Sequence, residues 1–333
     1  MRINGQKVKR IVVIGGGTGT FVVLRGLKNY PLRLSAIVAM SDSGGSNQRI
    51  RDEFGLLPTS DIRQSLVALS EDNGGAGLLR KLFMYRFSKG QGIAGMTFGN
   101  LFMAALSDIL GSQAEAIKQT GKVLRIHGSV IPVSYTDTNL FAEYENGKIL
   151  TEEHLIDEPL HDGTLKIKKI YLKPLALANS DALKAIKEAD LIILGPGDLF
   201  TSILPNLLVK GLGEALINAR AKLVFVMNLM TKYGQTYNFT ARDHLKALEK
   251  YLGKRVDFVI INSGKLPRIA CEQYAKFHEF PVVNDLRAKN YYQIILAPVC
   301  GQHLLKKEKS DTLNRSLIRH DSDRLAQVIV KIL

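Results

Sequence analysis

A glycine-rich turn directly after a buried strand most narrows the folds open to this chain. Residues 10–14 (RIVVI) are mostly β-branched, as in a parallel strand covered on both faces, and they run straight into GGGTGT at residues 15–20. A helix is expected to follow this turn. Glycines let backbone N–H groups approach an anion at the positive end of that helix, so phosphate is the natural ligand. The residues predicted to contact it are Gly16, Gly17, Thr18 and Gly19.

The turn matches neither of two common nucleotide-binding motifs in full. Thr20 stands where the third glycine or alanine of G-x-G-x-x-G would fall, counting from Gly15, and the Gly-Lys-Ser/Thr of a P-loop is missing. A tight strand-to-helix turn without a ligand is therefore the alternative to a phosphate site.

A second apolar strand, residues 34–40, ends at a polar loop. The loop reads SDSGG at residues 41–45, so the first 45 residues form a strand, a helix, a strand and a loop, which is a βαβ unit. Asp42 stands where a Rossmann acid would meet a ribose hydroxyl, and Gly44 and Gly45 would free the backbone beside it. The alternative is a turn in which Asp42 bonds its own backbone. Arg63 follows nearby and could hold a diphosphate or simply be solvated.

The same βα rhythm returns in the second half of the chain. Strands are predicted over 191–194, 223–228 and 256–262, and helices over 181–188, 205–219 and 240–252. This alternation predicts an α/β fold with a doubly wound, mostly parallel, Rossmann-like sheet, whose ligands bind beyond the carboxyl ends of the strands. The loop after residues 191–194 reads Gly195-Pro196-Gly197-Asp198 and is a second candidate anion site, with an inert loop as its alternative.

One domain over residues 1–333 is predicted, with two local departures. Residues 140–149 (LFAEYENGKI) alternate around an Asn-Gly turn signal, which indicates a β-hairpin excursion at about 135–175. Residues from about 265 to 333 are less regular, and we expect them to contribute to the ligand crevice; the final helix should start near Asp321.

Two polar residues at predicted helix starts are further site candidates. Asp61 opens a helical pattern and is either an N-cap or a catalytic or metal-binding carboxylate. Asn100 stands where an N-cap would precede the apolar residues 101–110, and a cap and a ligand contact are compatible there. The seven histidines show no metal-ligand spacing, and no Ser-His-Asp order follows from spacing.

The charge of the chain favours an anionic ligand. Lys and Arg number 45 against 31 Asp and Glu, which gives a formal net charge of +14. The basic residues are scattered and no RNA- or DNA-binding pattern accompanies them, so a nucleotide or sugar phosphate fits better than nucleic acid. Cys271 and Cys300 form no Cys-x-x-Cys pair, and the apolar N-terminal run is split by glycines, so we expect a cytoplasmic protein without membrane insertion.

Six segments together resemble the CofD/YvcK superfamily across nearly the whole chain. They are GGGTGTFVVLRGLKNY, SDSGGSNQRIRDEFGLLPTSDIRQSLVAL, FGNLFMAALSDI, LGPGDLFTSILPNLL, NLMTKYGQT with FTARDHLKAL, and IRHDSDRLA. The resemblance implies a CofD-like fold. The superfamily has two branches, the 2-phospho-L-lactate transferases of deazaflavin synthesis and the gluconeogenesis factors of the YvcK type. The long second segment and the terminal RHD stretch of this chain are more similar to the second branch.

The gluconeogenesis-factor branch implies a ligand and further site residues. It implies binding of UDP-N-acetylglucosamine or a related nucleotide sugar, and a role in cell shape and in growth on gluconeogenic carbon sources. The nucleotide would lie on the first glycine loop, Asp42 and the loop with Gly195 and Gly197, and Tyr274 and Arg319 would grip the UDP-sugar. The family more often has consecutive aspartates in the second segment, where this chain has Ser41-Asp42-Ser43, and the missing carboxylate weakens the case for Mg²⁺ there.

Three functions remain as hypotheses. The first is a nucleotide-sugar-binding regulator that performs no chemistry and whose occupancy is read by a protein partner. The second is a CofD-type transferase, for which Asp42 and Asp61 are the Mg²⁺ candidates and Asp61 the catalytic candidate. The third, a nicotinamide oxidoreductase, rests on the first loop alone. Mg²⁺ is expected as a cofactor only under the transferase hypothesis. The sequence does not decide whether the chain forms a homo-oligomer.

Overall fold

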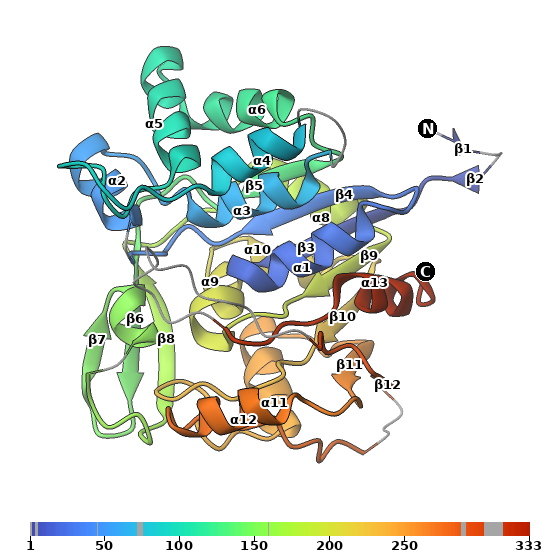
Figure 1. The fold of residues 1–333 in the computed structure, drawn as a ribbon. Coiled ribbons are helices and arrows are strands. Elements are labelled where there is room, and N and C mark those ends of the chain that lie inside the picture. The colour runs from blue at the N-terminus through green and yellow to red at the C-terminus, as the bar shows by residue number, and fades with distance from the viewer. Residues whose placement is uncertain are drawn as a thin grey trace.

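Seven parallel strands form the central sheet of the computed structural model, in the order β12-β11-β10-β9-β3-β4-β5 (Figure 1). The structure describes residues 2–3, 6–44, 46–71, 76–158, 160–287, 291–302 and 316–333. The strands are β3 (Arg10–Gly15), β4 (Arg33–Val38), β5 (Ser129–Pro132), β9 (Leu191–Leu194), β10 (Lys222–Val226), β11 (Phe258–Asn262) and β12 (Gln293–Ala297). The order runs outward in opposite directions from the β3–β9 pair, which is therefore the topological switch point of the sheet.

The strands at the centre of the sheet are apolar because both of their faces are covered. All four residues of β9 are buried, as are five of the six in β3. On one face of the sheet α1 packs against α3 and α13, and on the other α10 packs against α8 and α11 (Figure 1). Helices on both faces confirm the predicted doubly wound α/β class.

The helices are distributed along the whole chain. Their bounds are α1 (Gly17–Leu27), α2 (Ser46–Phe54), α3 (Ser60–Leu69), α4 (Ala76–Met84), α5 (Phe98–Leu110), α6 (Gln113–Val123), α7 (Glu153–Asp157), α8 (Ser180–Glu188), the π-helical turn η1 (Leu199–Ile203), α9 (Leu204–Leu207), α10 (Leu212–Ile217), α11 (Ala241–Leu252), α12 (Arg268–Ala275) and α13 (Ser322–Val330). The last begins one residue after Asp321, whose side chain caps it, as the sequence predicts.

A three-stranded antiparallel sheet projects from the central sheet beneath α2 (Figure 1). It consists of β6 (Asn139–Tyr144), β7 (Ile149–Thr151) and β8 (Ile167–Lys173), and we call these strands with α7 the β-lobe. The hairpin between β6 and β7 turns at Asn146-Gly147, and Gly147 has φ +82°, so the predicted hairpin is confirmed. A two-stranded ribbon, β1 (Arg2–Ile3) with β2 (Gln6–Lys7), precedes β3.

The predicted helix over 205–219 is wrong in its extent. The segment instead contains α9 and α10, and η1 precedes it. Pro205 stands at the start of α9, where it lacks only a hydrogen bond that the first turn does not need. Gly211 has φ +94° and separates the two helices, because a helix cannot continue through a left-handed residue.

Two predicted helix caps are also wrong. Thr97, and not Asn100, is the N-cap of α5; its hydroxyl accepts a hydrogen bond from the Asn100 N–H at 3.3 Å. Helix α3 begins at Ser60 after the N-cap Thr59, so Asp61 lies in the first turn and is not the cap. In both places a threonine precedes the polar residue that the sequence favoured, and hydroxyl and carboxylate or amide caps have similar preferences.

Candidate functional site

The two glycine loops meet at the switch point of the sheet. The first follows β3 and the second follows β9, which is the adjacent parallel strand, and the Gly195 N–H donates to the Ile14 carbonyl at 3.0 Å. A Cβ atom placed on Gly19 would collide with the carbonyl oxygen of Pro196 and lie 3.1 Å from the Gly197 nitrogen. The loops are therefore in direct backbone contact at the carboxyl edge of the sheet, where ligands of doubly wound folds bind.

The backbone of both loops takes conformations that favour glycine. Gly17, at the first position of α1, has φ +58°, and Gly195 has φ +73°. The N-cap of α1 is Gly16, so no capping side chain covers the first turn of this helix. Gly17, Thr18 and Gly19 are partly exposed beside that turn, and this arrangement suits a bound anion.

Two asparagines that were not among the predicted site residues donate hydrogen bonds to the loop backbones. The Asn206 amide donates to the carbonyls of Gly15 at 3.3 Å and Ser202 at 2.9 Å, and its side chain is fully buried. The Asn228 amide donates to the Gly197 carbonyl at 2.9 Å. Asn228 follows β10 at the same edge as the loops, which is a signal that the sequence offered; Asn206 lies inside α9 and offered none.

The predicted acids Asp42 and Asp61 both lie near a third carboxylate, Glu153 of α7. A Cβ atom on Gly16 would collide with the Asp61 carboxylate, so this acid lies against the first loop. Burial raises the pKa of Glu153 well above its ordinary value, and the neighbouring charges of Asp42, Asp157 and Asp61 raise it further. No sequence pattern singles out Glu153, because its relevance depends on where the β-lobe docks.

Asp42 is also the acceptor of its own turn. Its carboxylate accepts hydrogen bonds from the Gly44 N–H at 2.9 Å and from the side-chain amide of Asn47 at 2.5 Å. The turn that the sequence analysis gave as an alternative is thus formed, which fixes the carboxylate at the crevice wall. Gly45 lies outside the described residues.

Arg63 and Asn100 lie together in a buried polar network. The Arg63 Nε donates to the Asn100 Oδ1 at 3.0 Å, and the Asn100 amide donates to the Ser46 hydroxyl at 3.0 Å. Arg63 is 3% exposed and Asn100 is fully buried. These two predicted ligand residues therefore join α3, α5 and α2 through hydrogen bonds inside the protein.

A partly buried lysine, Lys232, whose side chain is 18% exposed, lies among acids of the second glycine loop and the β-lobe. The Lys232 ammonium lies 3.7 Å from Asp157 of α7 and 4.0 Å from Glu279. Burial opposes its charge, but Asp157, Asp198 and Glu279 outweigh burial and raise the pKa of Lys232. Burial raises the pKa of Asp198 to about 6, with Asp157 adding to the rise, and burial raises the pKa of Glu279 to about 7.

Tyr274 and Arg319 lie on two segments that contact each other. The Tyr274 side chain is 7% exposed, and its hydroxyl accepts hydrogen bonds from the N–H groups of Leu317 at 2.8 Å and Ile318 at 3.5 Å. The Arg319 carbonyl accepts a hydrogen bond from the Gly301 N–H at 2.8 Å. Tyr274 thus anchors the segment that carries Arg319, and Asp198 lies close enough to raise the pKa of Tyr274 after the larger effect of burial.

His320, next in the chain, is buried and has its pKa lowered to about 4 by that burial, so its ring is neutral at physiological pH. The neutral ring of His320 interacts with the backbone of Met227 after β10, and it adds no positive charge there.

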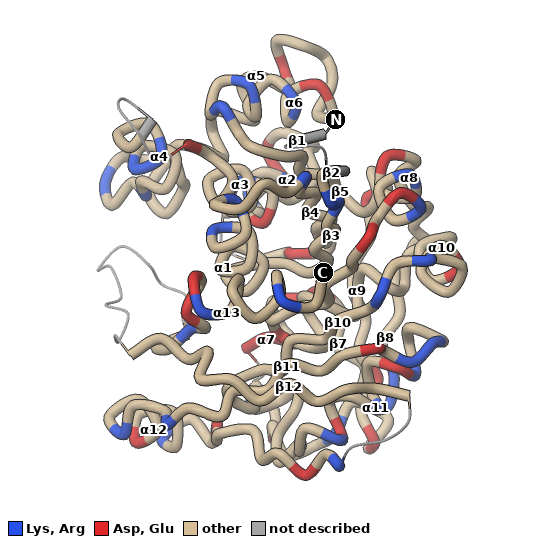
Figure 2. The backbone as a smooth tube through the Cα atoms, turned by 90° about the vertical axis from the view of Figure 1, so that its right-hand side faces the viewer, with Lys and Arg blue, Asp and Glu red and all other residues tan. Residues whose placement is uncertain are grey.

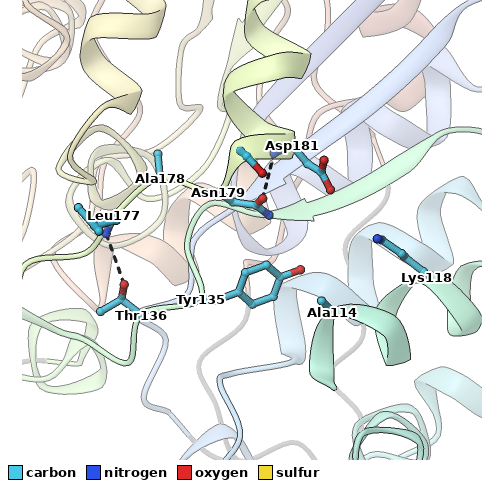
Figure 3. Close-up of a pocket in the computed structure, with 9 residues that line it drawn as sticks. Ala114, Lys118, Tyr135, Thr136, Leu177, Ala178, Asn179 and Asp181 are labelled. Carbon is cyan, nitrogen blue, oxygen red and sulfur yellow. Dashed lines mark hydrogen bonds between the residues drawn. The ribbon is translucent and has the colours of Figure 1, made fainter. Parts of the chain in front are cut away.

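A separate hollow of about 530 Å³ lies between α6 and the start of α8 (Figure 3). Figure 3 shows Tyr135 in the middle of this hollow, with Ala114 and Lys118 of α6 on one side of it and Asn179 and Asp181 at the start of α8 above it. None of its lining residues belongs to the glycine loops or to the carboxylates described above. The candidate site is therefore defined by the loop geometry and not by this hollow.

Lys and Arg are spread over many elements, with Asp and Glu among them near α8 and α12 (Figure 2). Within the described part of the chain, no helix is long and apolar enough to cross a membrane.

Comparison with known proteins places the chain in a family. The family model described as 2-phospho-L-lactate transferase CofD matches residues 11–300. The protein named gluconeogenesis factor from Bacillus subtilis (strain 168) is 38% identical, over 99% of this chain and 99% of that protein. The gluconeogenesis factor of Listeria innocua is 36% identical, over 97% and 95%.

A solved structure supports the same assignment. It is described as a member of the UPF0052 family from Bacillus halodurans, and it has a TM-score of 0.86 and 37% sequence identity, covering 98% of this chain and 100% of that one. The predicted resemblance to the superfamily, and within it to the gluconeogenesis-factor branch, is confirmed. This chain belongs to the CofD family.

Proposed function

We propose that this protein is a cytoplasmic regulator that binds UDP-N-acetylglucosamine or a related nucleotide sugar, and that a protein partner reads the occupied state. Through that partner it would support cell shape and growth on gluconeogenic carbon sources. The observation that carries the proposal is the contact between the two glycine loops, Gly19 against Pro196, at the β3–β9 switch point. Its relatives named gluconeogenesis factor support the physiological part.

The diphosphate would lie between the loops, with backbone N–H groups and the first turn of α1 facing its charge. Asp42 and Asp61 flank the position where the ribose and the phosphates would meet. Carboxylates accept hydrogen bonds from hydroxyl groups, so Asp42 and Asp61 suit the ribose, whereas the N–H groups of the glycine loops suit the phosphates.

Calorimetric titration with UDP-N-acetylglucosamine tests the proposal. We expect UDP-N-acetylglucosamine to bind saturably at one site per chain. ADP-ribose should bind with lower affinity than UDP-N-acetylglucosamine. The absence of measurable heat at millimolar UDP-N-acetylglucosamine would remove the proposal.

A CofD-type transferase is the second candidate, and the raised pKa values of Glu153 and Asp198 favour it together with the family match. Bound to the substrate phosphates, Mg²⁺ would neutralise charge that develops during transfer. Asp42 and Asp61 would be its protein ligands in this proposal, and the contact of the Asp61 carboxylate with Gly16 supports that role. Among the described residues, no group of three or more His, Cys, Asp or Glu is arranged to hold a metal without the substrate. Release of GMP from a guanylyl-activated phospholactate in the presence of the deazaflavin acceptor would decide for this reaction.

Replacing Tyr274 by phenylalanine should weaken nucleotide-sugar binding about tenfold. The change leaves the Leu317 N–H without its acceptor and loosens the segment that carries Arg319, at a cost of about 1–2 kcal/mol in the free energy of unfolding. Tyr292→Phe is the matched control, because it removes a hydroxyl that donates to the Arg287 carbonyl at 2.9 Å and not to the segment that carries Arg319. Calorimetry and urea unfolding separate the two: we expect similar losses of stability, and a loss of affinity for Tyr274→Phe alone. Equal affinities would show that Tyr274 has no part in binding.

A further inference from the structure

A second hollow, of about 250 Å³, lies between α2 and the β-lobe, and we call it the α2 hollow. Helix α2 contributes Gln48, Arg51 and Asp52 to its lining. The β-lobe and the turn before it contribute Asp137, Asn139 and Glu152, and Ser43 completes the lining. At roughly 30 Å³ for each water, the hollow has room for several waters or for one small organic group.

Two lining residues of the α2 hollow are chain neighbours of carboxylates that lie near the first glycine loop. Ser43 follows Asp42 in the chain, and Glu152 precedes Glu153. Asp42 and Asp61 both lie close enough to Glu153 to raise its pKa, and Asp61 lies against Gly16 of the first loop. A ligand whose diphosphate lies on the glycine loops could therefore extend past these carboxylates into the hollow.

The walls of the hollow are held in place by contacts between segments. The Arg51 guanidinium of α2 pairs with the Asp137 carboxylate at 2.7 Å. Ser43 is held by α7, because its hydroxyl lies 3.0 Å from the His154 Nδ1 and accepts a hydrogen bond from the His154 N–H at 3.2 Å. Arg51, Asp137 and Ser43 are thus already positioned before a ligand binds, which lowers the entropy cost of binding.

The chemistry of the lining selects the ligand group. All seven lining residues are polar and none is aromatic, so a flat heterocycle would find no apolar surface to stack on. Three carboxylates and one guanidinium give the lining a formal charge of −2, which disfavours a further phosphate or carboxylate. Carboxylates, amides and a guanidinium together offer many acceptors and donors for hydroxyl groups.

We propose that the α2 hollow binds a neutral, hydroxyl-rich group, the glycosyl part of a nucleoside diphosphate sugar, and so sets which ligand the protein accepts. This inference rests on the proposed function and adds to it the site of the sugar. Gln48 and Asp52 are the residues assigned to the sugar hydroxyls, since they lie four positions apart on one face of α2.

The test compares two ligands on three variants of the full chain. Gln48→Ala and Asp52→Asn remove the assigned contacts, and Glu53→Gln is the control, because Glu53 is an exposed acid next to Asp52 on the same helix but outside the hollow. Each protein is titrated calorimetrically with UDP and with UDP-N-acetylglucosamine. For Gln48→Ala and Asp52→Asn we expect the affinity for UDP-N-acetylglucosamine to fall about tenfold, and the affinity for UDP to change less than twofold. Glu53→Gln should bind both ligands as the unchanged protein does.

The outcomes separate this inference from the proposed function. If the unchanged protein binds UDP and UDP-N-acetylglucosamine but both substitutions leave the ratio of the two affinities as it was, the sugar lies elsewhere and this inference fails alone. It also fails alone if Glu53→Gln shifts the ratio as much as Asp52→Asn does. If the unchanged protein binds neither ligand, the proposed function fails and the inference fails with it.

Discussion

A Gly19→Ala variant is expected to lose at least about a hundredfold in nucleotide-sugar affinity and about 3 kcal/mol in the free energy of unfolding. The added methyl group would occupy the position of the Pro196 carbonyl oxygen, which is backbone and cannot rotate away. Relief would require the two loops to separate, and a diphosphate held by N–H groups from both loops would then lose one set of hydrogen bonds. Calorimetry measures the first effect and urea unfolding the second.

Gly17→Ala is the matched control for this prediction. Gly17 has φ +58°, but a Cβ atom there meets no atom within 4 Å. The variant should therefore lose about 1 kcal/mol of stability through backbone strain while the loops stay in contact. If Gly19→Ala bound the ligand as tightly as Gly17→Ala does, the contact between the loops would not be what forms the site.

Replacing Lys232 by methionine is expected to cost about 2 kcal/mol of stability at pH 8, between the effect of a surface ion pair and that of a fully buried one, because its side chain is 18% exposed. The change leaves Asp157, Asp198 and Glu279 facing one another without a cation. Lys222→Met is the control, since Lys222 pairs with Asp257 at the surface and its side chain is 63% exposed; its loss should cost less than about 1 kcal/mol.

The pH dependence of this cost has a defined sign. Asp198 and Glu279 have folded pKa values of about 6 and about 7, above the value of about 4 for unfolded acids. At these two groups the folded state therefore binds more protons, so their contribution to stability falls as the pH rises from about 4 to about 7. Without Lys232 both pKa values should rise further, so the variant should lose more stability between pH 5 and pH 8 than the unchanged protein. Urea unfolding at the two pH values measures this, and parallel curves for the two proteins would contradict it.

Local patterns predicted the elements on which the site is built. The strand at 10–14 and the strand at 191–194 are observed as β3 and β9, because uninterrupted β-branched and apolar residues suit a strand that is buried on both faces. The Asn-Gly turn of the β-lobe was predictable for a similar reason, since it depends on the conformations of two neighbouring residues. Helix ends were less predictable: Thr97 and Thr59 compete with their polar neighbours for the cap, and packing decides between them.

The residues that the sequence missed act through space. Asn206 supports Gly15 across 191 positions of the chain, and Glu153 and Lys232 meet the crevice only because the β-lobe docks beside the second loop. No spacing in the sequence encodes such contacts, because they depend on the order of the strands and on the placement of an excursion from the sheet.

By itself the sequence determined which segments become buried strands and which turns carry glycines that expose backbone N–H groups, since both follow from the side chains of adjacent residues. Only the tertiary structure decided that β9 lies beside β3, so that the Gly19 backbone contacts Pro196 and two separate turns form one edge of a crevice. The physical reason is that parallel pairing is set by packing both faces of the whole sheet under helices, a condition that no local stretch of residues contains.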